Sequence, residues 1–225
     1  LVWHSGSGWI VLAGLAQWRN GETGDIDAAG LAWAIVDRPV AVLPTAGTGY
    51  NEAESLLDYY SDLGGPEGYV VPVVDRSDAQ DPRNARLLAE AGLIYVADGP
   101  DLLRLTRVLR DSVALEALAQ AFEAGVCVVG MGAGAAGLGA WVSVSDPADP
   151  GRSERGLGLL QYVLVESVFP GDDPAEHLRG LLSAHEDCLG IGVPAGLALA
   201  LGPVGEVKTI GEGQVTVVVR QPGQP

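Results

Sequence analysis

The chain has 225 residues, a formal net charge of −16 and a hydrophobic content of 48%. Nucleic acids and anionic membranes bind clustered Lys and Arg, so this charge excludes both from the expected partners. The length allows a large core, and we expect residues 1–225 to form a single α/β domain.

Apolar runs alternate with helix-start signals in the first two thirds of the chain. Asn51 with Glu54 three residues later predicts a capping box, and Pro82 suits a first helical position. This alternation predicts a doubly wound, mostly parallel sheet covered by helices on both faces. The expected strands are 9–14, 39–44, 69–74, 93–97 and 126–130. The expected helices are 25–37, 51–63, 82–91, two across 100–124, and 133–140.

The last third of the chain contains short apolar runs separated by glycines. It predicts one helix at 174–187, which starts at Pro174, and a terminal antiparallel section. The complete pattern favours a three-layer αβα sandwich. The expected strands of this part are 160–166, 190–193, 197–201, 206–210 and 214–219.

Residues 126–137 join an apolar strand to a glycine-rich turn. The segment from Gly130 to Gly134 has the frame of a nucleophile elbow, G-x-S-x-G, with Gly132 in place of the serine. Small residues on both sides allow a sharp turn from strand to helix. Glycine also tolerates the strained backbone of the central position, so the frame predicts the turn without its nucleophile.

Other motifs accompany this turn. Together they resemble the cyanophycinase and dipeptidase E group of serine exopeptidases over roughly residues 8–218. The motifs are Gly8 to Gly14, Pro44-Thr45-Ala46, Asp98-Gly99-Pro100-Asp101, Gly156 to Leu160, and Gly190-Ile191-Gly192. The resemblance implies a flavodoxin-like, class I amidotransferase-like sandwich. It also implies a homodimer, because members of that family commonly associate.

The resemblance places the family's functional groups on residues that cannot perform the same roles. Gly132 stands at the nucleophile position and Val168 at the catalytic histidine. Asp101 replaces a glutamine, and Pro-Ala at 194–195 replaces an acidic residue. The arginine positions fall on Asp172, Pro174 and His177. Acyl transfer needs a hydroxyl, a base and oxyanion donors, and only the backbone N–H groups around Ala133 remain for this chemistry.

We therefore interpret the chain as a catalytically inactive relative that acts as a binding or scaffold protein. We expect a small-molecule or peptide ligand and no cofactor. The vestigial pocket is expected to contain Gly14, Thr45, Ala46, Gly99, Asp101, Gly130, Met131, Gly132, Ala133 and Ser167.

An active hydrolase with a different nucleophile is the alternative hypothesis. The candidate nucleophiles are Ser143, Ser145, Ser167 and Thr45. Ser167 lies next to the lost histidine position. No general base stands near any of the four in the sequence, which favours the inactive interpretation.

The segment from Gly132 to Gly137 also matches the dinucleotide frame G-x-G-x-x-G. That frame belongs in the first strand–helix unit, whereas here it lies in the fifth, so we expect no nucleotide. The three histidines, at 4, 177 and 185, lack metal-ligand spacing. The acidic segment 75–81 lacks the glycine and final glutamate of a calcium loop. We expect a solvated loop there and no metal site.

Cys127 lies inside an apolar strand and Cys188 follows the last predicted helix. Two cysteines in these positions predict buried free thiols, which suit a reducing compartment. The sequence contains neither a signal-peptide pattern nor an apolar run of membrane-spanning length. We therefore expect a cytoplasmic protein.

Overall fold

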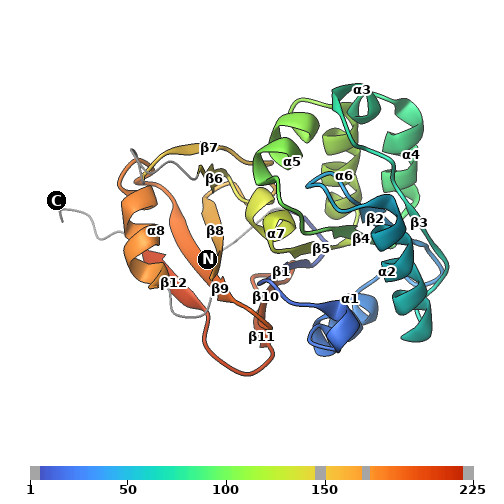
Figure 1. Cartoon of the computed structure of the whole chain (residues 1–225), viewed down its shortest axis with the longest axis horizontal. Helices are drawn as coiled ribbons and strands as arrows, with labels where there is room; N and C mark the ends of the chain where they lie inside the picture. The colour runs from blue at the N-terminus through green and yellow to red at the C-terminus, as the bar shows by residue number, and fades with distance from the viewer. Residues whose placement is uncertain (1–5, 145–150, 169–172, 220–225) are drawn as a thin grey trace.

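The computed structural model describes residues 6–144, 151–168 and 173–219. Its larger sheet has seven strands in the order β11-β10-β1-β5-β4-β2-β3 (Figure 1). The five strands from β1 to β3 in that order run parallel, and β10 and β11 are antiparallel additions at one edge. The strands are β1 Ile10–Ala13, β2 Val40–Leu43, β3 Gly68–Val70, β4 Leu93–Val96, β5 Cys127–Met131, β10 Ala198–Leu201 and β11 Val207–Ile210. Strands β1, β2, β4, β5 and β10 are buried throughout, as their continuous apolar runs predict.

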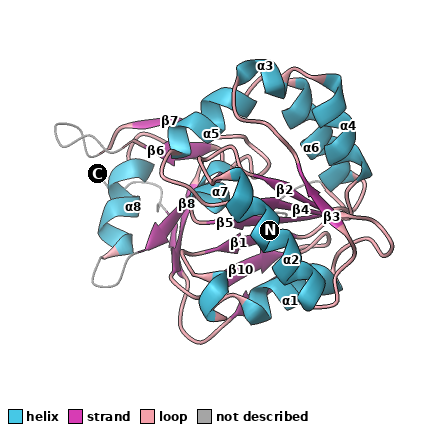
Figure 2. Cartoon of the chain, turned by 45° about the vertical axis from the view of Figure 1, so that its right-hand side comes forward, coloured by secondary structure: helices cyan, strands magenta, loops and turns pink. Residues whose placement is uncertain are grey.

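Helices cover both faces of this sheet (Figure 2). On one face, Ile26 of α1 and Leu56 of α2 pack against Val11 and Val42. On the other face, Leu105 of α5 and Leu118 of α6 pack in the cluster that contains Ile94. The helices are α1 Gly24–Ala32, α2 Tyr50–Asp62, α3 Arg76–Ala79, α4 Pro82–Glu90, α5 Leu102–Leu109, α6 Val113–Glu123 and α7 Ala133–Gly137, with a 3-10 turn, η1, at Trp18–Asn20. The predicted α/β sandwich is confirmed.

The remaining strands form a second sheet in the order β12-β9-β8-β6-β7. The predicted C-terminal antiparallel section is present as β10 and β11, whereas the second sheet was not expected from the sequence. Helix α8, Pro174–Leu182, packs on this second sheet through Leu178 and Leu181. The strands are β6 Trp141–Ser143, β7 Ser153–Arg155, β8 Val163–Val168, β9 Leu189–Pro194 and β12 Thr216–Val219.

Several boundaries differ from the sequence-based expectations. Helix α2 starts at Tyr50 after Gly49 and has no side-chain cap, so the predicted capping box of Asn51 and Glu54 does not form. Helix α8 ends at Leu182, which leaves His185 outside it. Strands β6 and β7 were not predicted, because their sequences, Trp-Val-Ser and Ser-Glu-Arg, contain no continuous apolar run.

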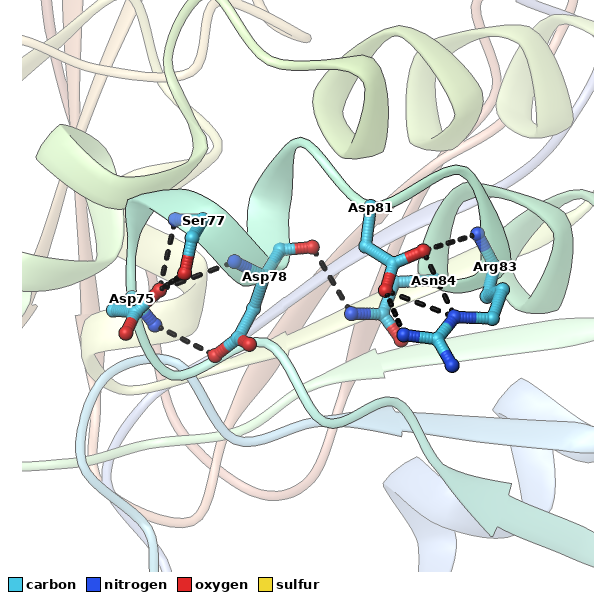
Figure 3. A network of polar contacts seen from close by, with 6 residues as sticks. All are labelled: Asp75, Ser77, Asp78, Asp81, Arg83 and Asn84. Carbon is cyan, nitrogen blue, oxygen red and sulfur yellow. Dashed lines mark hydrogen bonds and ion pairs between the residues drawn. The ribbon is translucent and has the colours of Figure 1, made fainter.

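The acidic segment at 75–81 is also more ordered than expected. Asp75 accepts hydrogen bonds from the backbone N–H groups of Ser77 and Asp78, and Asp78 accepts from the N–H of Asp75 (Figure 3). Asp81 caps α4 and pairs with Arg83 at 2.6 Å. These bonds lower the pKa values of Asp75 and Asp81 below their usual range. The carboxylates therefore act as helix caps for α3 and α4.

Candidate functional site

The turn after β5 has the backbone of a nucleophile elbow. Gly132 has φ 53° and ψ −113°, and α7 begins at the next residue. Its N–H donates to the carbonyl of Ala13 on β1 at 3.0 Å, and its carbonyl accepts from Ala136 at 3.0 Å. Residues other than glycine are strained at this positive φ. The sharp turn that the sequence predicts is present.

Two flanking glycines hold this turn close to its neighbours. A β-carbon at Gly134 would lie 2.0 Å from the carbonyl oxygen of Val96 on β4. A β-carbon at Gly130 would lie 2.7 Å from the α-carbon of Ala135. Both contacts are with backbone, which cannot move aside. The small residues are therefore required by the approach of α7 to the sheet.

Asp98 occupies the place that a nucleophile would fill. Its Oδ1 accepts a hydrogen bond from the N–H of Ala133 at 2.8 Å. A β-carbon built on Gly132 would lie 2.3 Å from the same oxygen. In an active elbow, the amide after the nucleophile helps to stabilise the oxyanion. In this chain a carboxylate already holds that amide.

Asp98 was not expected in this role from the sequence. It lies just after β4, and β4 is the parallel neighbour of β5. The carboxyl ends of neighbouring parallel strands meet at one edge of a sheet, which brings Asp98 and Gly132 together. Thr48 fixes the same segment, since its hydroxyl donates to the carbonyl of Asp98.

A cleft of about 640 Å³ opens beside Asp98. We call it the elbow cleft. Trp18, Arg19 and Glu52 form part of its wall, and Tyr95 and Met131 also line it. Arg19 pairs with Glu52 at 2.8 Å and lies 4.4 Å from the centre of the Trp18 ring. Such a cleft at the carboxyl ends of parallel strands is the usual place for a ligand in this type of sheet.

The expected pocket residues lie at different depths around this cleft. Gly99 and Met131 line it. Gly14 lies in the interior, where a β-carbon would be 2.0 Å from the carbonyl oxygen of Pro194. Ala46 is fully buried, and Asp101 caps α5 by accepting from the N–H of Arg104 at 2.8 Å.

Thr45 was one of the candidate nucleophiles. Its side chain is completely buried, and its hydroxyl donates to the carbonyl of Val73 at 2.8 Å. A hydroxyl held in this way is not available for attack on a substrate. The structure therefore contradicts this candidate. Ser145, another candidate, lies outside the described residues.

Strand β8 places the lost histidine position and its neighbour on opposite faces. The Val168 side chain lies on the face of the sheet that α8 covers. A β-carbon added to Gly192 would be 3.2 Å from its Cγ2. Ser167 pairs with Val193 of β9. Its Oγ is buried and forms no hydrogen bond within the described part of the chain. Ser167 therefore has no base to activate it there.

Ser143 does have a potential base. Its Oγ lies 3.4 Å from Nε2 of His177, and Oε1 of Glu166 lies 3.8 Å from the same nitrogen. We call these three residues the Ser143 cluster. Burial raises the pKa of Glu166 to about 7, and a hydrogen bond with Ser143 opposes that rise. No base lies near Ser143 in the sequence, but β6, β8 and α8 bring His177 and Glu166 to it in the fold.

The geometry of the Ser143 cluster differs from that of a catalytic triad. In a triad the serine and the carboxylate bind opposite ring nitrogens of the histidine, whereas here both approach Nε2. The N–H of Val144, the residue after the serine, donates to the carbonyl of Arg152 at 2.9 Å. This amide is therefore already used in the β6–β7 pairing and is unavailable to an oxyanion.

A second serine–histidine contact lies across the same hairpin. Oγ of Ser153, the strand partner of Ser143, is 2.6 Å from Nε2 of His185. The His185 ring stacks on Trp141 at 4.0 Å, and burial lowers its pKa. This neutral imidazole fixes the end of β7 against the segment after α8. We assign the contact a structural role, since no carboxylate orients the ring in the described residues.

The remaining predictions concern thiols, metals and membranes. Cys127 and Cys188 are buried free thiols, as predicted, and burial raises the pKa of Cys127 to about 12. Within the described ranges, no three His, Cys, Asp or Glu residues gather as a metal site. In the same ranges no helix is long and apolar enough to cross a membrane.

Comparisons with known proteins identify the family of this chain. The model of peptidase family S51 matches residues 34–203. The chain belongs to peptidase family S51. It is similar to a cyanophycinase from Synechococcus elongatus, with 31% identity over 81% of this chain and 59% of the relative. A cyanophycinase from Geminocystis herdmanii is 28% identical over 81% of this chain and 70% of its own length. The chain therefore spans little more than half of the first of these relatives.

Solved structures show the same fold. The crystal structure of a peptidase from an acI-B1 Actinobacterium matches 98% of this S51 chain and 94% of its own length, with a TM-score of 0.80 and 22% identity. A putative peptidase E protein from Listeria monocytogenes matches 92% of this chain with a TM-score of 0.58 and 15% identity. At such identities the likeness supports the fold and leaves the chemistry to the site itself.

Proposed function

We propose that this S51 family member is non-catalytic and acts as a binding or scaffold protein, as a homodimer in the cytoplasm. The single observation that carries the proposal is the hydrogen bond from the Ala133 N–H to the Asp98 carboxylate, above a glycine at the nucleophile position. The S51 scaffold supports the proposal, because the elbow has kept its shape while its reactive group is gone.

Two physical effects oppose hydrolysis at this elbow. Gly132 has no hydroxyl to attack a carbonyl carbon. A tetrahedral intermediate would also carry a negative oxygen next to the Asp98 carboxylate. The two negative charges would repel each other. The carboxylate further competes for the Ala133 amide, which is the donor that the oxyanion requires.

The elbow cleft supports a binding role. Its volume of about 640 Å³ is that of a small-molecule or short-peptide site. It combines the Trp18 ring with charged groups at Arg19, Glu52 and Asp98. These charged and aromatic groups can hold a polar ligand.

The test compares this protein with an active relative, the cyanophycinase of Synechococcus elongatus. Both are incubated with a fluorophosphonate probe, with cyanophycin and with aspartyl dipeptides. We expect the relative to be active and this protein to show neither labelling nor cleavage. Cleavage of any of these substrates by this protein would overturn the proposal.

A hydrolase that uses Ser143 is a second candidate function. The 3.4 Å approach of His177 to its Oγ supports it, since a nucleophile and a base within reach are the signature of covalent catalysis. The placement of Glu166 and the engaged amide of Val144 oppose it. Probe labelling that mass spectrometry maps to Ser143 would favour this candidate over the first.

The proposed homodimer needs a charge-poor interface, since each chain carries a net charge of −16. Leu31 and Trp33 at the end of α1 are candidates for it, and both are partly buried. The Trp33 ring already stacks on Trp9 at 4.0 Å, which leaves less of it for a partner. Light scattering at micromolar concentration should report a dimer, and a monomer at every concentration would remove this part of the proposal.

A further inference from the structure

The elbow cleft carries more negative charge than its own cations neutralise. Asp98, Glu22 and Glu52 line it together with one cation, Arg19. Glu52 already holds Arg19 at 2.8 Å. Glu22 accepts only from the backbone N–H of Gln17 and, at longer range, from Asn20. Within the described residues, neither Asp98 nor Glu22 forms an ion pair.

Tyr95 adds an independent observation on the floor of the same cleft. Its side chain is 3% exposed, yet it lines the cleft and forms no hydrogen bond to another described residue. Its ring is fixed edge-on against Tyr60 at 5.9 Å. Burial, with Asp27 and Asp98 nearby, raises its pKa well above the usual value, so the phenol stays neutral. The Tyr95 hydroxyl is not among the buried polar atoms that lack a partner, so it is accessible from the cleft. It is therefore free to accept a hydrogen bond from a polar ligand there.

We propose that the elbow cleft binds an alkyl diamine without a carboxyl group, with one ammonium on Asp98 and the Tyr95 oxygen, and the other on the Glu22 side. This inference rests on the proposed binding function, because a substrate undergoing acyl transfer would need the Ala133 amide that Asp98 holds. Ammonium groups donate to carboxylates in strong, charge-assisted hydrogen bonds.

Charge selects this class of ligand over the alternatives. A ligand carboxylate would face Asp98, and the Arg19 guanidinium that could receive it is paired with Glu52. A metal dication needs several oxygen or nitrogen ligands in one place, and the described residues offer no such group. The net charge of −16 also attracts organic cations toward the protein surface.

The test is calorimetric titration of the full chain with diaminobutane at low salt. The comparison ligand is γ-aminobutyrate, in which a carboxylate replaces one ammonium. We expect the diamine to bind and the amino acid not to bind. Asp98→Asn should weaken diamine binding about tenfold or more, since an amide can still accept from Ala133 but carries no charge. Tyr95→Phe should weaken it by about threefold, through loss of one hydrogen bond.

The matched control is Asp101→Asn, which removes the same charge three residues away. Asp101 caps α5 and does not line the cleft, and asparagine caps helices equally well. Its affinity for the diamine should equal that of the parent.

Absence of diamine binding at millimolar concentration, or equal affinity in Asp98→Asn and the parent, would overturn the inference. Either result would leave the non-catalytic proposal standing, since that proposal falls only if a substrate is hydrolysed. If Asp98→Asn does not fold, Glu22→Gln and Tyr95→Phe supply the same comparison, and unchanged affinity in both would overturn the inference.

Discussion

The elbow and the Ser143 cluster lack opposite halves of a hydrolase site. The elbow has the strained turn, with Gly132 at φ 53°, but no hydroxyl and no base. The Ser143 cluster has a hydroxyl, an imidazole and a carboxylate within 3.4 and 3.8 Å, but lies on a paired strand. Its neighbouring amide is bound in that pairing, while the elbow amide is bound by Asp98.

This difference shows that a list of catalytic residue types does not define an active site. An oxyanion requires backbone donors that the fold leaves unpaired, and a turn at the end of a strand provides them. A residue in the middle of a ladder does not, because its neighbours already pair. Backbone position therefore limits the chemistry of Ser143, and side-chain loss limits that of the elbow.

The largest effect should come from the glycine that supports the elbow. We expect Gly134→Ala to lower the free energy of unfolding by about 3 kcal/mol or more, because the new β-carbon would lie 2.0 Å from the Val96 oxygen. Denaturant unfolding measures the change. Gly180→Ala is the control, since nothing lies within 4 Å of a β-carbon at that helical position. Equal stability of the two variants would show that α7 does not pack against β4 as described.

The contribution of the Ser143 cluster to the free energy of unfolding should depend on pH. Burial raises the pKa of Glu166 from 4.5 to about 7, so the folded chain holds this proton more tightly than the unfolded chain. The free energy of unfolding is therefore highest below about pH 4.5, where Glu166 is protonated in both states. It falls by about 3 kcal/mol as the pH rises to about 7, because the folded chain holds the proton that the unfolded chain has lost. Glu166→Gln cannot ionise and should be more stable than the parent above that window. Unfolding curves across the window measure the difference.

A control variant sharpens the Glu166 comparison. Glu123→Gln at the exposed end of α6 is the control, and we expect its stability to stay within about 0.5 kcal/mol of the parent at each pH. A parent and a Glu166→Gln variant with parallel pH profiles would contradict the burial of this carboxylate.

The sequence predicts the backbone turn of the elbow, but it does not predict the Asp98 carboxylate that lies beside Gly132. Small residues from Gly130 to Gly134 have a local cause, the tight turn, and local patterns are visible in a sequence. Asp98 reaches Gly132 only because β4 lies beside β5, and His177 reaches Ser143 only through the second sheet. Such contacts depend on strand order, which spacing along the chain does not reveal.

The same limit explains the errors in secondary structure. The long buried strands were predicted to within a few residues, because continuous apolar runs identify them. Strands β6 and β7 have only three residues each and carry Ser143 and Ser153. Their pairing, rather than their composition, makes them strands. The second sheet and its serine cluster were therefore not predictable as a unit.

A serine in the elbow should have an intermediate effect. Gly132→Ser places a β-carbon at φ 53° and 2.3 Å from Oδ1 of Asp98, so we expect it to fold with about 1–3 kcal/mol less stability. Adding Asp98→Ala should restore the share of the lost stability that the steric clash causes. The share that backbone strain causes should remain. A double-mutant cycle by denaturant unfolding separates the two. Full additivity would show that Asp98 does not contact the elbow.

The smallest effect should come from Ser143→Ala. The 3.4 Å contact with His177 is long for a hydrogen bond and partly exposed, so its loss should change the free energy of unfolding by no more than about 0.5–1 kcal/mol. Ser153→Ala provides a matched serine on the paired strand, and its shorter contact of 2.6 Å should make it the more destabilising of the two. Both variants and the parent should remain unlabelled by a fluorophosphonate. Labelling of the parent and Ser153→Ala that disappears in Ser143→Ala would reverse the comparison, because it would show that a serine on a paired strand can act without the elbow.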